Sequence, residues 1–200
     1  APIVVLAKKR AYHLSKHVAP NMTTVGVMLP YSPLHHLLLK EAGGRTLVMT
    51  SANVSGLPIA YKNEECRQSI GEIADFYLMH NRDILHPVDD SVVQIVKGTT
   101  DFFRKSRGYV PDALFSKNNV DGIVAFGGQQ KTTFTLGRNE QVFIGPHIGD
   151  LDNVNTIEHY KKELKHLLTW IDPKQQIGVI DYHPNYQTRQ LVNEFSFKEV

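Results

Sequence analysis

Short hydrophobic runs alternate with amphipathic stretches along the whole chain, a pattern typical of α/β architecture. In the first half, β-branched and apolar runs predict strands, and stretches with caps and flanking prolines predict helices. We expect strands at residues 3–6, 25–29, 46–50, 75–79, 91–96 and 101–104. We expect helices at residues 9–18, 34–42 and 63–73.

The regular hydrophobic pattern is interrupted near residues 111–119, a stretch that has no sustained period and is rich in turn-forming residues. This interruption predicts a linker. A later helix at residues 155–171 repeats apolar positions every three or four residues, so one of its faces should pack on a sheet. The strands expected beside it are residues 122–126, 132–136, 141–144 and 177–180. The pattern therefore predicts two α/β units in tandem, residues 1–113 and 120–200, the second of them incomplete.

Composition agrees with a folded protein that has its own core. The chain has 200 residues, of which 42% are hydrophobic and 21% are charged. We expect no membrane segment, because no apolar run approaches the roughly 20 residues that span a bilayer. The chain opens on a strand-like run without an initiator methionine and stops at Lys-Glu-Val, so we expect a segment of a longer protein.

The net charge, the single cysteine and the histidines limit the kinds of binding site and chemistry that this chain is expected to have. A net charge of +2 gives no bulk argument for nucleic-acid binding. The single cysteine, Cys66, excludes an intrachain disulfide and a multi-cysteine zinc site, and it fits a reducing cytoplasm. Its sequence context predicts a packing residue, not a nucleophile. None of the ten histidines stands in an H-x-x-x-H or H-E-x-x-H arrangement with a carboxylate partner, so we expect no metal site in this chain.

The segment from Thr50 to Gly56, Thr-Ser-Ala-Asn-Val-Ser-Gly, follows a predicted strand, where open α/β sheets bind ligands. The hydroxyl groups of Ser51 and Ser55, the Asn53 amide and nearby backbone N–H groups are suited to phosphate oxygens. A turn that satisfies its own backbone is the alternative, and local chemistry leaves both readings open.

A second stretch, Arg104-Lys105-Ser106-Arg107-Gly108, places three cations in four residues beside a glycine. Guanidinium groups bind phosphate oxygens in a bidentate manner, so Arg104 and Arg107 suit a polyphosphate or carbamoyl phosphate. The alternatives are a solvated charge run and a nucleic-acid contact. Further along, His147 and Asp150 share a glycine-containing turn, where they predict a substrate contact, a loop-fixing hydrogen bond or a plain structural turn.

Taken in order, the motifs of both halves resemble a known family. Val-Gly-Val-Met-Leu-Pro-Tyr-Ser-Pro, Met-Thr-Ser-Ala-Asn-Val-Ser-Gly, His-Asn-Arg-Asp-Ile, Asp-Asp-Ser-Val-Val and Arg-Lys-Ser-Arg-Gly-Tyr-Val-Pro resemble the YrdC-like domain of the HypF carbamoyltransferases of nickel-iron hydrogenase maturation. Phe-Gly-Gly-Gln-Gln-Lys-Thr-Thr-Phe, Pro-His-Ile-Gly-Asp-Leu and Asp-Tyr-His-Pro-Asn-Tyr resemble the opening of that family's Kae1-like domain.

The resemblance implies a fold and an organisation. The fold is a YrdC-like twisted mixed sheet with helices, followed by the first part of an actin-like (Kae1-like) α/β domain. Residues 1–113 would lack the N-terminal part of the first domain, and residues 120–200 would form only the N-terminal part of the second. The family's full enzyme also carries an acylphosphatase domain and a zinc region, so zinc is expected only outside this segment, and the segment alone should be inactive.

The resemblance also implies a chemistry. ATP, with Mg²⁺, and carbamoyl phosphate would give carbamoyl-adenylate, whose carbamoyl group passes to the C-terminal cysteine of a HypE-like acceptor and becomes a cyanide ligand of the hydrogenase. Positions matching nucleotide or phosphate contacts are Ser51, Asn53, Ser91 and Arg107, and Lys131 is a candidate contact in the second domain. The alternatives are a threonylcarbamoyl-adenylate enzyme of tRNA modification and a double-stranded-RNA binding module.

A last expectation comes from the reactivity of the intermediate. Carbamoyl-adenylate is a mixed anhydride that water destroys, so enclosure protects it. We therefore expect the loops at residues 51–53 and 127–133 to open toward one interior space in the intact enzyme.

Overall fold

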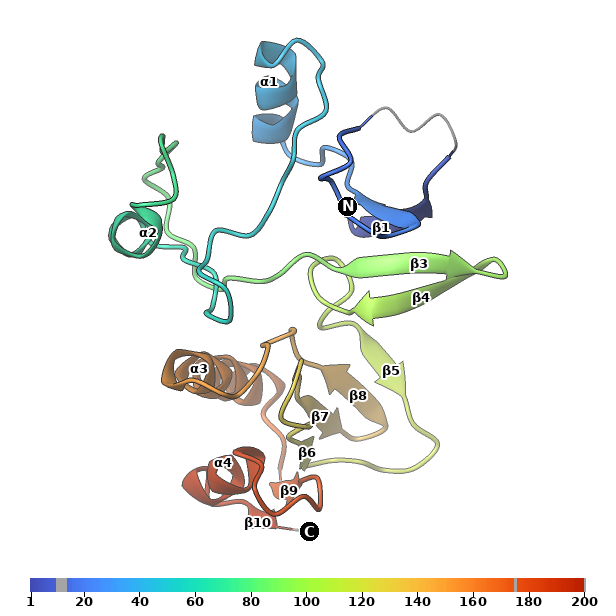
Figure 1. The fold of residues 1–200 in the computed structure, drawn as a ribbon. Helices are drawn as coiled ribbons and strands as arrows, with labels where there is room; N and C mark the ends of the chain where they lie inside the picture. The colour runs from blue at the N-terminus through green and yellow to red at the C-terminus, as the bar shows by residue number, and fades with distance from the viewer. Residues whose placement is uncertain (10–13, 175, 200) are drawn as a thin grey trace. The chain divides into compact units, whose positions relative to one another are not determined.

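The computed structural model describes residues 1–9, 14–174 and 176–199. They form an α/β protein with two mixed sheets, as expected from the sequence (Figure 1). The chain groups into two compact units, one made of Ala1–Thr50 and Asp90–Tyr109, the other of Ser51–Asp89 and Val110–Val200. Both units are therefore discontinuous in sequence.

The first unit is a four-stranded sheet with one helix. The order β2-β1-β3-β4 pairs β1 with β2 and β3 with β4 antiparallel, while β1 and β3 run parallel. Ser32 caps the helix by accepting a hydrogen bond from the His35 N–H at 3.2 Å, and Pro33 stands at the first helical position. The elements are β1 (Ile3–Ala7), β2 (Thr24–Val27), α1 (Pro33–Glu41), β3 (Val92–Val96) and β4 (Thr99–Arg104).

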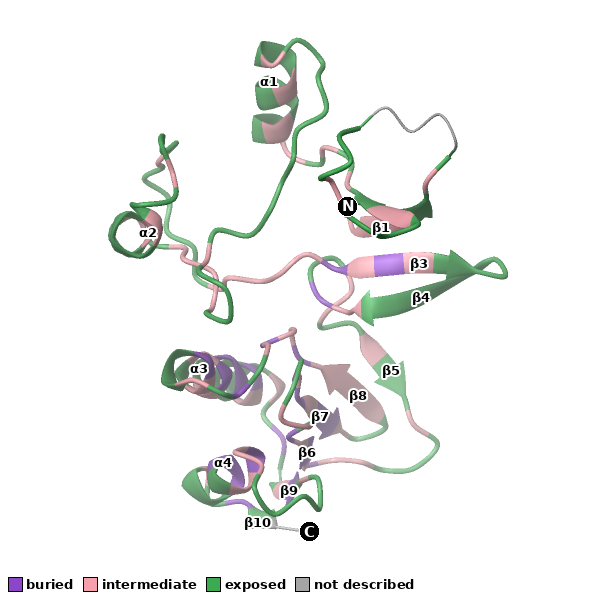
Figure 2. Ribbon diagram, viewed as in Figure 1, coloured by how far each residue is buried: buried purple, intermediate pink, exposed green. Residues whose placement is uncertain are grey.

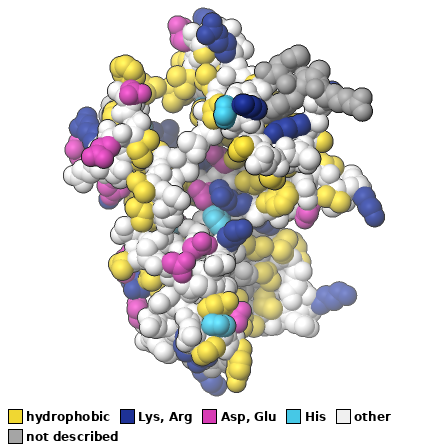
Figure 3. Space-filling view, in the orientation of Figure 1, with side chains coloured by type: hydrophobic (Ala, Val, Ile, Leu, Met, Phe, Trp, Pro, Cys, Tyr) yellow, Lys and Arg dark blue, Asp and Glu magenta, His cyan; other side chains and the backbone are white. Residues whose placement is uncertain are grey.

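Burial within this unit is slight. Val93 is its buried apolar residue among those the structure describes, and α1 has no buried residue (Figure 2). Leu34, Leu37 and Leu38 on α1 are all exposed. In the space-filling view, hydrophobic side chains accordingly lie at the surface among lysines and arginines (Figure 3).

The second unit contains a six-stranded sheet in the order β10-β9-β6-β7-β8-β5. Strands β6, β9 and β10 are parallel neighbours, and β6-β7-β8-β5 are antiparallel neighbours. The elements are α2 (Asn63–Ile70), β5 (Ala113–Phe115), β6 (Ile123–Ala125), β7 (Thr135–Arg138), β8 (Gln141–Ile144), α3 (Val154–Ile171), β9 (Ile177–Val179), α4 (Thr188–Glu194) and β10 (Lys198–Glu199).

The hydrophobic core cluster belongs to this second unit and is built around α3. As the periodicity predicted, α3 buries one face, which carries Tyr160, Leu164 and Leu167. The Tyr160 hydroxyl donates to the Phe126 carbonyl oxygen at 2.9 Å, and burial raises the pKa of this phenol well above its ordinary value. Helix α3 is therefore a rigid reference for the loops around it.

Several predicted elements differ from the structure. The helix expected at residues 9–18 is wrong over 14–18, which form bends and turns; residues 10–13 lie outside the described part. Residues 46–50 and 75–79 are not strands, because no neighbouring strand pairs with them and β-propensity alone does not make a sheet. Conversely, β5 lies in the expected linker because it pairs with β8.

None of the helices in the described part of the chain combines the length and the apolar character needed to cross a membrane.

Candidate functional site

In the first unit, the predicted cationic stretch is held by Ser91, the residue just before β3. The Ser91 hydroxyl accepts from the Ser106 N–H at 2.8 Å and donates to the Arg107 carbonyl oxygen at 3.0 Å. Ser91 is fully buried, with 0% of its surface exposed. Its hydroxyl therefore fixes the loop that carries Arg107, while the direct phosphate contact suggested by resemblance stays a prediction.

Replacing Ser91 with alanine should lower the free energy of unfolding by about 2 kcal/mol, because the buried Ser106 N–H would lose its acceptor. Ser106→Ala is the matched control, since the Ser106 hydroxyl is itself buried without a hydrogen-bond partner in the described structure. That control should be neutral or slightly stabilising. Urea denaturation measures both, and equal effects of the two substitutions would refute the assigned role of Ser91.

The Arg107 side chain is oriented by two neighbours in the same unit. One guanidinium nitrogen donates to the Tyr31 hydroxyl and lies 3.6 Å from Asp90 Oδ1. The side chain remains 48% exposed, so it is both positioned and accessible to an anion. Tyr31 and Asp90 were not predicted, because each is distant from the cationic stretch in the sequence. Two other residues predicted to contact phosphate belong to the same unit. Arg104 is the last residue of β4. Thr50 is exposed and is the last residue of the segment Ala1–Thr50.

In the second unit, the predicted loop at residues 51–56 satisfies part of its own backbone. The Asn53 side-chain amide donates to the carbonyl oxygens of Val54 at 3.1 Å and Leu57 at 2.9 Å. Ser51 and Ser55 are exposed. The two readings of this loop are thus compatible: Asn53 shapes the turn, and the serine hydroxyl groups stand at the surface.

The loop between β6 and β7, residues 127–133, is fixed from both ends. The Lys131 N–H donates to Asp150 Oδ1 at 2.6 Å, so Asp150 makes a loop-fixing hydrogen bond. Gly127 has φ +74°, and a Cβ there would lie 2.3 Å from the Thr133 carbonyl oxygen, so only glycine fits. The side chain of Lys131 is exposed, and its phosphate contact and the role of His147 stay predictions.

Two further residues organise these loops. Gln129 donates from Nε2 to the Leu151 carbonyl oxygen and to Asp152 Oδ1, both at 2.9 Å. Asn153 is the N-cap of α3 and also donates to the Gly56 carbonyl oxygen at 2.8 Å. An asparagine just before a periodic apolar run predicts a helix cap. The bonds of Gln129 and Asn153 to distant residues could not be predicted, because no local sequence pattern indicates them.

A histidine and carboxylate cluster joins the segment Ser51–Asp89 to α3. Glu163 is 5% exposed, and its Oε2 lies 3.4 Å from His86 Nδ1. The His86 ring packs against the ring of His166 with centroids 3.9 Å apart. One turn earlier on α3, burial lowers the pKa of His159, against the opposing charge of Glu163.

Acid should therefore weaken this unit. Because the pKa of His159 lies below its ordinary value of 6.5 in the folded protein, the unfolded chain binds more protons between the two values. The contribution is complete above about pH 6.5 and is lost as the pH falls toward the folded pKa. Urea denaturation at pH 5.5 and 7.5 should show a smaller pH difference for His159→Gln than for the unaltered protein. An equal difference in both would contradict the assignment.

Among the residues that the structure describes, no group of three or more histidines, cysteines, aspartates and glutamates is arranged to hold a metal ion.

Comparison with known families gives the class of protein. Residues 1–106 match the Sua5/YciO/YrdC family model, described as "Telomere recombination", and residues 118–200 match the model of the HypF Kae1-like domain. The chain thus joins a YrdC-type domain to a Kae1-like one. The exact limits of 1–113 and 120–200 stay predictions.

Relatives define the particular family. The chain is 40% identical over 191 residues to a carbamoyltransferase HypF of Synechocystis, covering 95% of this chain and 25% of that protein. It is 35% identical over 202 residues to a probable carbamoyltransferase HypF of Methanocaldococcus jannaschii, covering 98% of this chain and 26% of that protein. The chain therefore spans about a quarter of the length of these curated relatives.

Solved structures agree. The crystal structure of full-length HypF in the phosphate- and nucleotide-bound form matches with a TM-score of 0.91 and 37% identity, over 100% of this chain and 31% of that one. HypF of T. kodakarensis matches with a TM-score of 0.92 and 32% identity, over 100% and 26%. The chain belongs to the HypF carbamoyltransferase family, as the motifs indicated.

Proposed function

We propose that this chain is the part of a carbamoyltransferase that activates and transfers a carbamoyl group. The observation that carries the proposal is the match of the whole chain to HypF proteins, including one structure described as phosphate- and nucleotide-bound. Water hydrolyses carbamoyl phosphate to carbamate and inorganic phosphate, and the proton released goes to solvent. A carbamate oxygen then attacks the α-phosphorus of ATP, supplied as its magnesium complex, and pyrophosphate leaves.

The second step consumes the carbamoyl-adenylate. The thiol of the C-terminal cysteine on a HypE-like acceptor attacks the carbamoyl carbon, AMP leaves, and the thiol proton is released to solvent. Both steps depend on orienting the reactants and neutralising phosphate charge. Exposed hydroxyl groups at Ser51 and Ser55, the oriented guanidinium of Arg107 and the exposed Lys131 are groups of that kind.

Isotope exchange tests the first step in the full-length protein. Labelled pyrophosphate should enter ATP only when carbamoyl phosphate is present. Exchange that requires threonine and bicarbonate instead would overturn the proposal in favour of tRNA modification. Strong salt-dependent binding of double-stranded RNA, with no exchange, would overturn it in favour of an RNA-binding module.

The second step is tested with the acceptor. Labelled carbamoyl phosphate should label an acceptor that ends in cysteine, and should not label the same acceptor with its terminal cysteine changed to serine. Equal labelling of both would contradict transfer to that thiol.

A further inference from the structure

We propose that Asn153 is a positioning residue that sets the loop at residues 51–56 relative to the loop at residues 127–133. Its side chain makes two kinds of bond at once. Asn153 Oδ1 accepts from the Thr156 N–H at 2.8 Å and from the Thr156 hydroxyl at 3.0 Å, which caps α3. Asn153 Nδ2 donates to the Gly56 carbonyl oxygen at 2.8 Å.

The residues just before Asn153 hold the other loop. Asp150 Oδ1 accepts from the Lys131 N–H at 2.6 Å. The Leu151 carbonyl oxygen and Asp152 Oδ1 each accept from Gln129 Nε2 at 2.9 Å, and the Leu151 N–H donates to the Gln129 carbonyl oxygen. Four consecutive residues, 150–153, therefore bond to both loops.

Helix α3 packs in the core, whereas the loop at residues 51–56 is weakly packed. Helix α3 is fixed in the core by Tyr160 and Leu164, both 0% exposed. The loop at residues 51–56 has no buried residue. Asn153 therefore ties a weakly packed loop to a helix with a buried face in the same unit.

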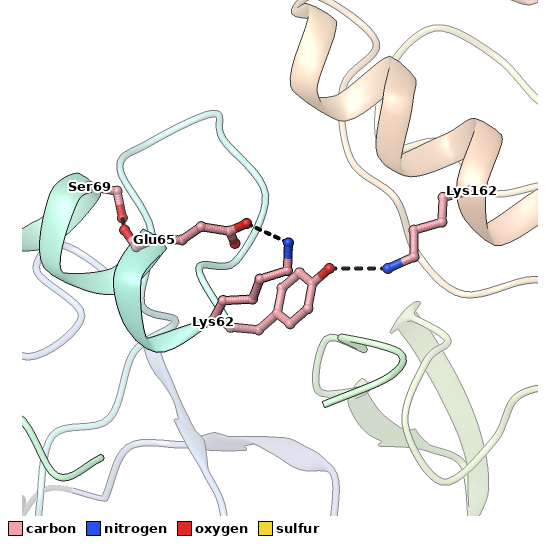
Figure 4. A network of polar contacts seen from close by, with 5 residues as sticks. Lys62, Glu65, Ser69 and Lys162 are labelled. Atoms are coloured by element: carbon pink, nitrogen blue, oxygen red, sulfur yellow. Dashed lines mark hydrogen bonds and ion pairs between the residues drawn. The ribbon is translucent and has the colours of Figure 1, made fainter. Parts of the chain in front are cut away.

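A surface contact between the segment Ser51–Asp89 and α3 is a weaker anchor for the loop. The Lys162 ammonium donates to the Tyr61 hydroxyl at 3.1 Å, beside the exposed pair of Lys62 and Glu65 (Figure 4). These groups are at the surface, where such contacts contribute little. Tyr61, Lys62 and Glu65 also lie outside the loop, after it in the sequence. Asn153 on the other hand bonds directly to the loop backbone, at Gly56.

The inference rests on the proposed function in one respect. If the loop at residues 51–56 contacts the nucleotide, ATP must order an untethered loop when it binds. The free energy spent on this ordering lowers the apparent affinity for ATP. Chemistry after binding is then little affected. The expected kinetic signature is a raised KM for ATP with a nearly unchanged kcat.

The test is Asn153→Asp in the full-length protein. Aspartate keeps a side-chain oxygen that can cap α3 but lacks the amide donor, and it places an acceptor against the Gly56 carbonyl oxygen. The KM for ATP in pyrophosphate exchange should rise about three- to tenfold, with kcat within about twofold. Hydrogen exchange should accelerate by a similar factor over residues 51–60, where the amides of Asn53, Leu57 and Ala60 are hydrogen-bonded.

Asn155→Asp is the matched control, because it adds the same charge in the first turn of α3 at an exposed position. It should leave both readouts unchanged. Equal effects of the two variants, or unaltered hydrogen exchange at residues 51–60 in Asn153→Asp, would overturn the inference.

Two outcomes are kept separate. If the unaltered enzyme shows no carbamoyl-phosphate-dependent exchange, the proposed function fails, while hydrogen exchange still tests the tether. If Asn153→Asp does not fold, Asn153→Ser takes its place, because serine caps a helix but is too short to reach Gly56. Faster hydrogen exchange over the loop in that variant supports the inference, and unchanged exchange refutes it.

Discussion

Arg107→Lys should lower the rate of carbamoyl-phosphate-dependent pyrophosphate exchange by about 30- to 100-fold, which corresponds to about 2–3 kcal/mol of transition-state stabilisation. Lysine keeps the positive charge but loses the planar fork that binds two phosphate oxygens. It also loses the geometry that lets one nitrogen meet both the Tyr31 hydroxyl and Asp90. Initial exchange rates of the purified full-length variant measure the effect.

Tyr31→Phe separates binding by Arg107 from its orientation. It removes the phenolic oxygen that accepts from the guanidinium and leaves the guanidinium itself intact. A loss of only about two- to fivefold is expected, since Asp90 still orients the arginine. Near-normal exchange by Arg107→Lys would mean that Arg107 is a solvated cation without a role in the reaction.

Gly137→Ala should be the most damaging single-methyl change to the second unit. A Cβ at residue 137 would lie 1.9 Å from the Val120 carbonyl oxygen and 2.8 Å from its carbonyl carbon. Backbone atoms cannot move aside cheaply, so β7 or the approach to β6 must shift. We expect the free energy of unfolding to fall by about 3 kcal/mol or more, seen as a lower midpoint in thermal unfolding.

Gly128→Ala is the matched stability control. A Cβ there would meet only the Tyr186 ring, at an ordinary 3.9 Å. The control should change the free energy of unfolding by less than about 1 kcal/mol. Similar midpoints for the two alanine variants would show that the close approach at Gly137 is relieved by a small backbone movement.

Local patterns predicted the regular elements that carry their own signals. A cap with a flanking proline predicted a helix where α1 lies, and the apolar repeat predicted α3 with its buried face. Strand predictions were wrong where strand formation depends on pairing with a segment far away in the sequence. Residues 46–50 have the composition of a strand but no pairing neighbour, whereas β5 has a turn-rich context and pairs with β8. The short elements α4 and β10 were not predicted at all.

In the candidate site, too, some features were predictable from the sequence and others were not. Motif residues such as Asn53, Arg107 and Asp150 were singled out from the sequence, and each makes specific hydrogen bonds in the structure. Their partners were not predictable, because the bonds join positions far apart, as between Asn153 and Gly56. Burial of the Ser91 hydroxyl was equally hidden, since it depends on how the loop after β4 folds back.

Because each compact unit is made of two separate chain segments, a single break in the chain does not separate the units. Strands β1 and β3 pair in parallel across the excursion Ser51–Asp89, which belongs to the other compact unit. A protease that cuts once near residue 50 or residue 89 would therefore release neither unit, because each is still held by segments on both sides of the nick. Excising the excursion and rejoining its ends with a short glycine-serine bridge would shorten a closed loop, at an entropic change that varies only with the logarithm of its length. Expressing either unit alone thus requires the chain to be divided at three places, after residues 50, 89 and 109.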